Sequence, residues 1–343
     1  TSRGVHLPGI HRSPDLRLTA ACDIDPKALR YARETYGIDE AHCFTDYRDL
    51  IRCPDVDAVD ISTPNCVHYE IALAAAEAGK PYAVEKPITM TAAEADRLAA
   101  VTKEKGVQSM VCFSYRFKAA ARYARDLVER GMIGDIYHVD MQYYQAWGLP
   151  HCNTPLVWRF EKQYTGSGAL GDLGSHALDL VRFVTGKDYR RVVSHAGTFV
   201  HEREKLDGSG MGKVDVDDFA NYFAEMDGGT AATFRITRFG YGRGNYQTME
   251  IYGSRGAIQY SLDHTPDADE IEICIGEANA EAHVFTKLPI PAKFKVDQMQ
   301  SFADLLNGKA GGKAATIEDG RVNQHVMDAV LRSAETGAWE TID

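Results

Sequence analysis

The amino-acid sequence predicts an α/β fold with two domains: a doubly wound parallel sheet, followed by an α+β domain built on a large, open, mostly antiparallel sheet. Its 343 residues exceed the roughly 100–200 residues of one typical domain. Short apolar runs alternate with helical stretches over residues 16–113, whereas longer strand-like segments dominate after residue 134. We therefore expect one domain over residues 1–117 and a second over residues 118–343.

The first half alternates between strand-like and helical segments. The strand-like segments are "LRLTAACD", "VDAVDIST", "PYAVEKP" and "VQSMVCFS", and the helical ones are "PKALRYARETYG", "HYEIALAAAEAGK" and "TAAEADRLAAVTKEKG". Strands separated by helices of about 10–15 residues must cross over and run parallel. Residues 1–18 are typical of the helix that follows a first strand and a GxGxxG turn, so we expect that strand and turn to be missing from the chain. The alternative is a fold that is not a dinucleotide-binding domain.

The second half combines strands with four helices. Long segments such as "DIYHVDMQYYQAW" and "GTAATFRITRF" are joined by Gly-rich turns, which favours antiparallel connections. Helices are expected around residues 118–131 and 168–186, and two more near residues 297–308 and 317–336. We expect residues 201–218 to form a loop because Gly, Asp and Lys dominate there.

Composition and charge argue against several classes of function. The net charge is −11 with acidic and basic residues interleaved, so the surface lacks the basic footprint that nucleic acid or anionic lipid requires. No apolar run approaches the roughly 18 residues of a membrane span. The seven cysteines are scattered without CxxC spacing, which disfavours disulfides and zinc. We expect a cytoplasmic protein with no nucleic-acid or membrane partner and no bound metal.

An acidic residue, Asp23, ends the first strand-like segment. In doubly wound folds, a carboxylate at this point accepts hydrogen bonds from the adenosine ribose of NAD and repels the 2′-phosphate of NADP. The position therefore favours NAD, with NADP less favoured. A plain strand-ending aspartate in a turn is the alternative, and Asp23 alone does not exclude it.

Polar residues also follow the next strand-like segment. Thr63, Pro64, Asn65 and His68 lie at a carboxyl end, where ligands bind in open α/β sheets. They could line a cofactor. The alternative is a simple turn, because Pro and Asn commonly punctuate loops.

The stretch "YAVEKPIT" places Glu85 and Lys86 at a strand end and follows them with Pro87. Proline restricts the backbone and gives the flexible lysine a fixed root. A lysine beside a cationic nicotinamide is usable as a proton relay or hydrogen-bond donor. A surface salt bridge at a loop is the alternative.

The predicted helix over residues 168–186 carries two potential catalytic groups on one face. Helical spacing aligns Asp172, His176, Asp179 and Phe183 in one stripe. A carboxylate and an imidazole four residues apart suit acid–base chemistry, and the glycines upstream permit close approach of a ligand. No second histidine or carboxylate pair stands out to complete a metal site. A structural, hydrogen-bonded histidine is the alternative.

Together these segments resemble the Gfo/Idh/MocA family of oxidoreductases. "DISTPNCVHYE" and "VEKPIT" are similar to its TPN and EKP segments, "FSYRF" to its aromatic-Arg-Phe segment, and "GALGDLGSHALDL" to its D-x-G-x-H helix. The resemblance implies an NAD-binding Rossmann domain and a homodimer or homotetramer assembled through the C-terminal sheet. It also implies a cis Lys86–Pro87 bond, which fits the near-restriction of cis peptides to X–Pro.

Site residues follow from the motifs and the resemblance together. The expected catalytic residues are Lys86, Asp172 and His176. The expected cofactor-binding residues are Ser2, Arg3, Asp23, Ser62, Thr63, Pro64, Asn65, His68, Glu85, Lys86, Pro87 and Arg116. The expected substrate-binding residues are Lys86, Arg116, Trp158, Arg159, Asp172 and His176.

The resemblance implies an NAD-dependent dehydrogenase that acts on a secondary alcohol of a sugar, sugar derivative or cyclitol such as inositol. One alternative is an NAD-dependent redox glycosidase or glycoside oxidase. A second is a non-catalytic NAD-binding sugar sensor, which has no need of Lys86, Asp172 and His176 together.

Overall fold

A computed structural model describes residues 2–263, 269–309 and 313–342 of the chain. It divides the chain into two compact units. Unit 1 comprises residues 1–112 and 296–321, and unit 2 comprises residues 113–295 and 322–343. Within the described ranges, no helix is both long and apolar enough to cross a membrane.

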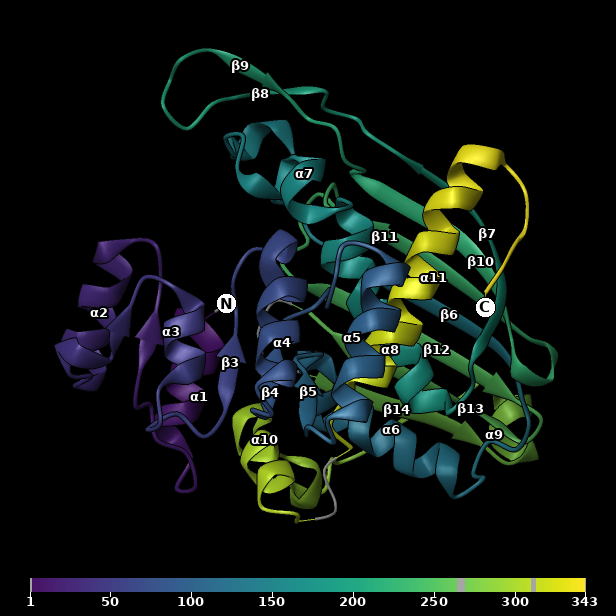
Figure 1. The fold of residues 1–343 in the computed structure, drawn as a ribbon. Helices are drawn as coiled ribbons and strands as arrows, with labels where there is room; N and C mark the ends of the chain where they lie inside the picture. The colour runs from purple at the N-terminus through teal and green to yellow at the C-terminus, as the bar shows by residue number, and fades with distance from the viewer. Residues whose placement is uncertain (1, 264–268, 310–312, 343) are drawn as a thin grey trace. The chain divides into compact units, whose positions relative to one another are not determined.

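Unit 1 is built on two small parallel sheets. One pairs β1 (Ala21–Cys22) with β2 (Cys43–Phe44), and the other has the order β3 (Val59–Ile61), β4 (Tyr82–Val84), β5 (Ser109–Val111). The helices are η1 (Ser2–His6), α1 (Leu7–Arg12), α2 (Pro26–Tyr36), η2 (Glu40–His42), α3 (Tyr47–Arg52), η3 (Asn65–Val67), α4 (His68–Glu77), α5 (Ala92–Glu104) and α10 (Gln298–Leu306). The predicted parallel α/β architecture is therefore confirmed (Figure 1).

Local sequence signals explain where α2 begins and ends. The Asp25 carboxylate accepts the backbone N–H of Lys27, and Pro26 occupies the first helical turn, where its missing N–H has no cost. Gly37 follows the helix with φ of 70°, a left-handed conformation that glycine adopts without a Cβ penalty. After α2 the chain forms η2 and then enters β2.

Unit 2 is built on one nine-stranded sheet with the order β15-β14-β13-β12-β6-β11-β10-β7-β16. All pairs are antiparallel except β6 with β11. The strands are β6 (Ile136–Tyr144), β7 (Tyr189–Gly197), β10 (Phe219–Met226), β11 (Thr230–Thr237), β12 (Tyr246–Gly253), β13 (Gly256–Leu262), β14 (Asp269–Ile275), β15 (Thr286–Lys287) and β16 (Glu340–Thr341). The expected large, mostly antiparallel sheet is confirmed.

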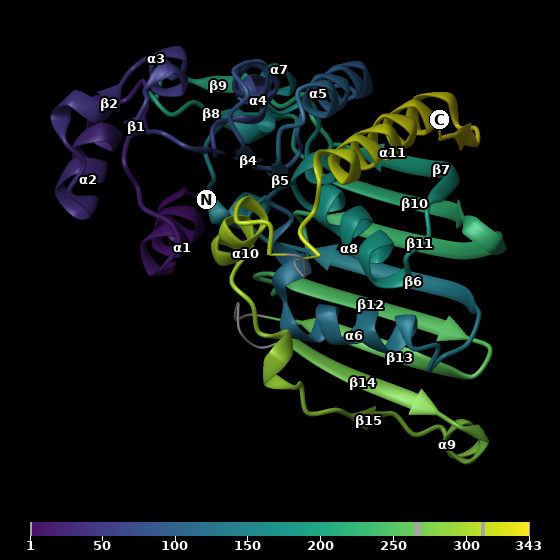
Figure 2. The ribbon, with the colours of Figure 1, turned by 60° about the horizontal axis from the view of Figure 1, so that its bottom comes forward.

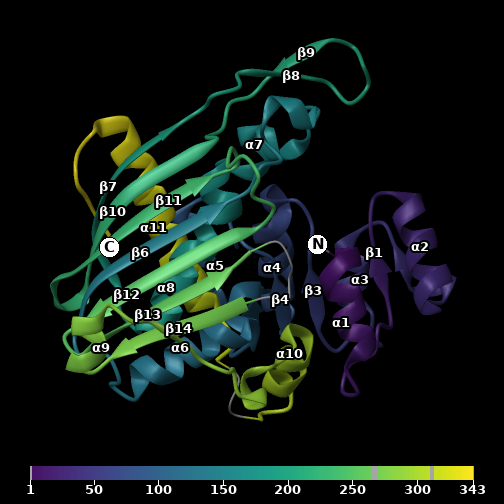
Figure 3. The same ribbon diagram turned by 180° about the vertical axis from the view of Figure 1, so that it is seen from behind.

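One face of this sheet is covered by α6 (Ala119–Glu129), α8 (Ser175–Thr185) and α11 (Ile317–Thr336) (Figure 2). Alternate residues of β11 explain why: Phe234 and Ile236 are buried, whereas Arg235 between them is exposed. Phe234 stacks on Tyr222 of β10 with ring centroids 4.6 Å apart, inside the core of the unit. Figure 3 shows the opposite face, on which the described chain places no helix over the central strands.

The remaining helices of unit 2 are short and lie mainly in connections. They are η4 (Ser114–Phe117), η5 (Pro150–Cys152), η6 (Trp158–Phe160), α7 (Lys162–Thr165), η7 (Leu170–Gly174), η8 (Asp227–Gly229), α9 (Glu277–Ala282) and η9 (Ala292–Phe294). The helix predicted over residues 168–186 forms as η7, a π-helical turn, followed directly by α8.

Two features differ from the sequence expectation. Residues 201–218 contain a hairpin of β8 (Glu202–Glu204) and β9 (Met211–Lys213), which extends from one end of the sheet of unit 2 (Figure 1). Residues 296–321, which the sequence placed in the second domain, cluster with unit 1. Backbone contacts explain the second difference, because the Val111 N–H of β5 donates to the Ala315 carbonyl.

Candidate active site

The candidate cofactor residues of unit 1 lie after the carboxyl ends of its strands. Asp23 follows β1, is exposed, and accepts the backbone N–H of Asp25 at 2.8 Å, which orients its carboxylate. Ser2 and Arg3 lie in η1, and the Arg3 guanidinium stacks on the Tyr31 ring at 4.2 Å from the ring centroid. Asp23 is therefore placed as an accessible acceptor next to the start of α2.

The loop after β3 has an exposed side and a buried side. Thr63 and Pro64 are exposed, whereas Asn65 and His68 are buried. The His68 ring nitrogens lie 2.8 Å from the carbonyl oxygens of Pro87 and Thr63. Burial lowers the pKa of His68, and the two carbonyls oppose that shift. His68 thus connects this loop to the turn after β4 from the buried side of the loop. Thr63 and Pro64 form its exposed side.

Glu85, Lys86 and Pro87 follow β4, and the Lys86–Pro87 bond is cis, as the resemblance implied. The Glu85 side chain is buried, while Lys86 is half-buried. Glu85 Oε2 accepts the backbone N–H of Lys86 at 3.1 Å. Its other oxygen, Oε1, lies 2.9 Å from Nε2 of His6. The carboxylate therefore links the start of the chain to the lysine that the sequence assigned to catalysis.

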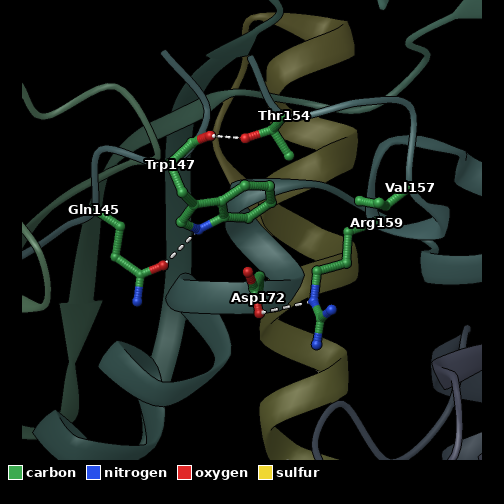
Figure 4. A pocket seen from close by; sticks show the side chains of 6 residues that line it. All are labelled: Gln145, Trp147, Thr154, Val157, Arg159 and Asp172. Atoms are coloured by element: carbon green, nitrogen blue, oxygen red, sulfur yellow. Dashed lines mark hydrogen bonds and ion pairs between the residues drawn. The ribbon is translucent and has the colours of Figure 1, made fainter. Parts of the chain in front are cut away.

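Unit 2 contains a pocket of about 410 Å³. Its lining residues are Gln145, Trp147, Thr154, Val157, Arg159 and Asp172. Figure 4 shows the Trp147 indole, the Arg159 guanidinium and the Asp172 carboxylate facing the same space. Trp147 is held at two points: its indole N–H donates to Gln145 Oε1 at 2.7 Å, and its backbone carbonyl accepts the Thr154 hydroxyl at 2.7 Å.

A buried arginine, Arg238, organises one wall of this pocket. Its guanidinium donates to the carbonyls of Gly168 at 2.8 Å and Arg159 at 3.2 Å, and it lies 3.4 Å from Asp172 Oδ2. It also lies 4.6 Å from the centroid of the Trp147 ring, a cation–π geometry. Burial lowers the pKa of Arg238, and the neighbouring carboxylates counteract it. The Arg238 guanidinium therefore contacts the Asp172 carboxylate, the Trp147 ring and the backbone carbonyl of Arg159.

The glycine-rich segment before Asp172 is required for close backbone packing. A Cβ atom on Gly168 would overlap the backbone carbonyl oxygen of Asp217. The Asp217 carboxylate accepts the N–H groups of Gly168 at 2.6 Å and Leu170 at 2.7 Å, at the start of η7. Burial raises the pKa of Asp217, while these donors and Arg238 oppose the rise. The segment is thereby anchored immediately before Asp172.

His176 lies in the first turn of α8, four residues after Asp172, and is buried. Its ring packs edge-on against Tyr115 with centroids 4.8 Å apart, and near Tyr143. The two tyrosine hydroxyls lie 2.6 Å apart, and Gln145 donates to Tyr143 Oη at 3.1 Å. Burial raises the pKa of both tyrosines, so they stay neutral. The imidazole therefore packs against two tyrosine rings, one of which is hydrogen-bonded to Gln145, a residue that lines the pocket.

Arg116, which the sequence predicts to contact cofactor and substrate, forms an ion pair inside unit 2. It is buried and forms a bidentate ion pair with Asp179 of α8, at 2.7 Å and 2.6 Å. Its guanidinium also lies 5.1 Å from the Phe183 ring centroid. The four residues of the predicted stripe therefore have different surroundings. Asp179 and Phe183 contact Arg116 inside unit 2.

Of the two remaining substrate candidates, Arg159 lines the pocket and Trp158 does not. The Arg159 guanidinium stacks on the Trp158 ring at 4.4 Å from its centroid and lies 4.0 Å from Asp172 Oδ1. Trp158 thus orients Arg159. Sequence reasoning missed Trp147, Gln145 and Arg238; a tryptophan directly after a predicted strand was the one signal that could have drawn attention to the first of them.

The residues of unit 1 fit a dinucleotide. An exposed carboxylate, Asp23, after β1 matches ribose hydroxyl donors, and the exposed Thr63–Pro64 loop follows a second parallel strand. The half-buried Lys86 follows a third. This set of acceptors and donors at carboxyl ends is what such a cofactor requires, and nothing in it demands a metal.

Two family models match the chain. Residues 2–113 match a model described as "Oxidoreductase family, NAD-binding Rossmann fold". Residues 121–259 match a model described as "GFO/IDH/MocA C-terminal domain". Both models therefore correspond in order to the two halves of the chain.

The chain is also similar to individual oxidoreductases in sequence and structure. Levoglucosan dehydrogenase from Pseudarthrobacter phenanthrenivorans is 31% identical over 348 residues, covering 92% of this chain and 87% of its own. The crystal structure of an oxidoreductase domain protein from Kribbella flavida has a TM-score of 0.89 at 32% identity, covering 100% and 96% of the two chains. A structure of levoglucosan dehydrogenase with NADH and L-sorbose has a TM-score of 0.85 at 31% identity, covering 95% and 89%.

Proposed function

The chain belongs to the GFO/IDH/MocA family of oxidoreductases and carries an NAD-binding Rossmann domain, and from this premise we propose that it oxidises a secondary alcohol of a sugar, sugar derivative or cyclitol. The observation that carries the proposal is the pocket of unit 2, where the Trp147 indole faces the same space as Asp172 and Arg159. An aromatic ring can pack against the apolar C–H face of a polyhydroxylated ring, and a few polar side chains can bind its hydroxyl groups.

The protein groups divide the proton chemistry between them. His176 would take the hydroxyl proton as general base, and Asp172 would orient the substrate and stabilise the imidazolium that forms. We assign Lys86 the role of hydrogen-bond donor to the reacting oxygen, on the strength of its EKP motif. When bound, NAD supplies the acceptor for the hydride that leaves the carbinol carbon. Asp23, Thr63 and Pro64 are the residues we propose to hold it.

The test is a screen of NAD reduction over inositols, aldoses, sugar acids and glycosides. Because a relative is named levoglucosan dehydrogenase, the screen also includes levoglucosan. The proposal expects NADH to accumulate together with an oxidised sugar. Glycoside cleavage without net NADH would instead support a redox glycosidase. Binding of sugar and NAD with no turnover of any compound would support a sensor.

We also propose that the protein forms a homodimer or homotetramer through the helix-free face of the unit 2 sheet. Large aromatic side chains on three of its strands support this: Tyr137 is 61% exposed, Phe223 59% and Tyr252 38%. Single exposed apolar residues are ordinary, but several on one sheet face mark an interaction surface. A second copy of the chain would cover them.

A further inference from the structure

A fully buried histidine, His6, connects the beginning of the chain with the segment that contains Lys86. The imidazole has a relative exposure of 0%. Its Nδ1 lies 2.8 Å from Asp60 Oδ1, on β3, and its Nε2 lies 2.9 Å from Glu85 Oε1, directly after β4. All three residues belong to unit 1. Neither Asp60 nor His6 has a role in the reaction described above.

If Asp60 and Glu85 are both ionised, this geometry requires both ring nitrogens of His6 to carry hydrogen. An ionised carboxylate only accepts hydrogen bonds, so a nitrogen facing one must donate. With a carboxylate on each side, the ring is an imidazolium. Burial by itself lowers the pKa of His6, but Asp60 and Glu85 outweigh it and raise the pKa to about 10. A cation between two carboxylates also offsets the cost of burying those carboxylates.

A metal site is the competing interpretation of this cluster. Cys112 contributes a third potential ligand atom, within 4.8 Å of those of His6 and Asp60. However, a metal requires a thiolate and a neutral imidazole. Burial raises the pKa of the Cys112 thiol well above its usual value, and His6 Nδ1 lies 2.8 Å from Asp60 Oδ1, a direct hydrogen-bond distance. The cluster is therefore arranged around a proton-bearing ring.

The same carboxylate that binds His6 also binds the backbone of Lys86. Glu85 uses Oε1 for the imidazole and Oε2 for the Lys86 N–H, at 2.9 Å and 3.1 Å. We propose that His6 is a positioning residue for Lys86: as a buried cation held by Asp60, it fixes Glu85, and Glu85 fixes the backbone from which the lysine side chain extends. This inference rests on the proposed function where it concerns turnover, and on geometry alone where it concerns the His6 charge.

The kinetic test combines His6→Gln with Lys86→Ala in a double-mutant cycle. Misplacement of a catalytic group by about 1 Å lowers rates up to about 10²-fold, so His6→Gln should lower kcat by about 10- to 100-fold with a smaller change in the KM of the sugar. In the Lys86→Ala background the same substitution should change kcat by less than about twofold, because its effect passes through the lysine. Losses that multiply independently would overturn the proposal.

Matched variants separate positioning from general damage to the fold. His42→Gln removes a peripheral histidine of unit 1, whose Nε2 lies 3.0 Å from Asp55, and should leave kcat unchanged. Glu85→Gln keeps the His6 ring and neutralises the carboxylate that faces both His6 and the Lys86 N–H, so it should show the same non-additivity with Lys86→Ala. If His6→Gln does not fold, the cycle of Glu85→Gln with Lys86→Ala is used in its place. Non-additive losses in kcat support the proposal, and losses that multiply independently overturn it.

Nitrogen-15 spectra of histidine-labelled protein test the charge of His6 without any turnover. The signal that His6→Gln removes should show both ring nitrogens protonated from about pH 6 to about pH 9, beyond the usual titration near 6.5. A neutral His6 ring at about pH 8 would overturn the inference. If no sugar is oxidised, the proposed function fails, and this spectrum still confirms or refutes the cation.

Discussion

The Arg238 guanidinium lies 3.4 Å from the Asp172 carboxylate, and Arg238 has no exposed surface. The two residues are 66 positions apart in the sequence. Because Arg238 also donates to the carbonyls of Gly168 and Arg159 and lies against Trp147, it joins the parts of the pocket wall that come from three separate segments. The orientation of Asp172 thus depends on a residue that lines no part of the pocket.

Replacing Arg238 with Met should destabilise the protein by about 3–5 kcal/mol, because buried carboxylates lose their cation. The matched variant Arg130→Met removes a surface pair at the C-terminal end of α6, in which the guanidinium lies 3.4 Å from Asp126. It should change stability by less than about 0.5 kcal/mol. Denaturant unfolding measures both variants. Equal effects would show that Arg238 does not organise the wall.

Substitution of Gly168 by Ala should cost about 1–3 kcal/mol or more, since the new Cβ would overlap the Asp217 carbonyl and the backbone has to move. Gly4 in η1 has open space where a Cβ would be. Gly4→Ala should therefore be neutral or stabilise by about 0.5–1 kcal/mol, the usual gain of Gly→Ala in a helix. Thermal unfolding distinguishes the two, and a stable Gly168→Ala protein would contradict the packing described.

The pKa of His6, raised from 6.5 to about 10, predicts a pH-dependent stability. Between these values the folded state keeps a proton that the unfolded state releases, so the contribution is complete below pH 6.5 and is lost as pH rises through about 10. Within that window the free energy of unfolding should fall by about 1.4 kcal/mol per pH unit more in wild type than in His6→Gln. If the free energy of unfolding falls equally with pH in wild type and His6→Gln, the raised pKa of His6 is refuted.

Phe223→Arg tests the proposed subunit interface on the helix-free face of the unit 2 sheet. A charge at this position cannot be buried against a second copy without a partner, so sedimentation velocity should show dissociation to smaller species. Tyr164→Arg is the matched control, because Tyr164 is 39% exposed but lies in α7. An unchanged sedimentation coefficient in Phe223→Arg would place the interface elsewhere.

Local patterns made much of the architecture predictable. The strands that end at Cys22, Ile61 and Val84 stop where the apolar runs end, because consecutive residues decide a short buried strand. The helical spacing of Asp172 and His176 is likewise a property of neighbouring turns. The family resemblance is confirmed by matches to both halves of the chain.

Several unpredicted features depend on pairs that are distant in sequence. His6 meets Glu85 across 79 positions, and Arg116 meets Asp179 across 63. Neither partner can be identified from the periodicity of its own segment, because periodicity reports only which face is buried. For the same reason the ion pair between Arg116 and Asp179 could not be predicted from the aromatic motif that contains Arg116.

In the proposed reaction a hydride passes directly from the sugar to NAD, with His176 as the base. The measurement uses the best sugar of the screen, deuterated at the carbinol carbon, and follows the label in the recovered nicotinamide for wild type and His176→Ala. We predict one deuterium per reduced NAD in wild type and a kcat about 10² to 10⁴ lower in His176→Ala. Product formation without label in NAD, or full activity of His176→Ala, would contradict the claim.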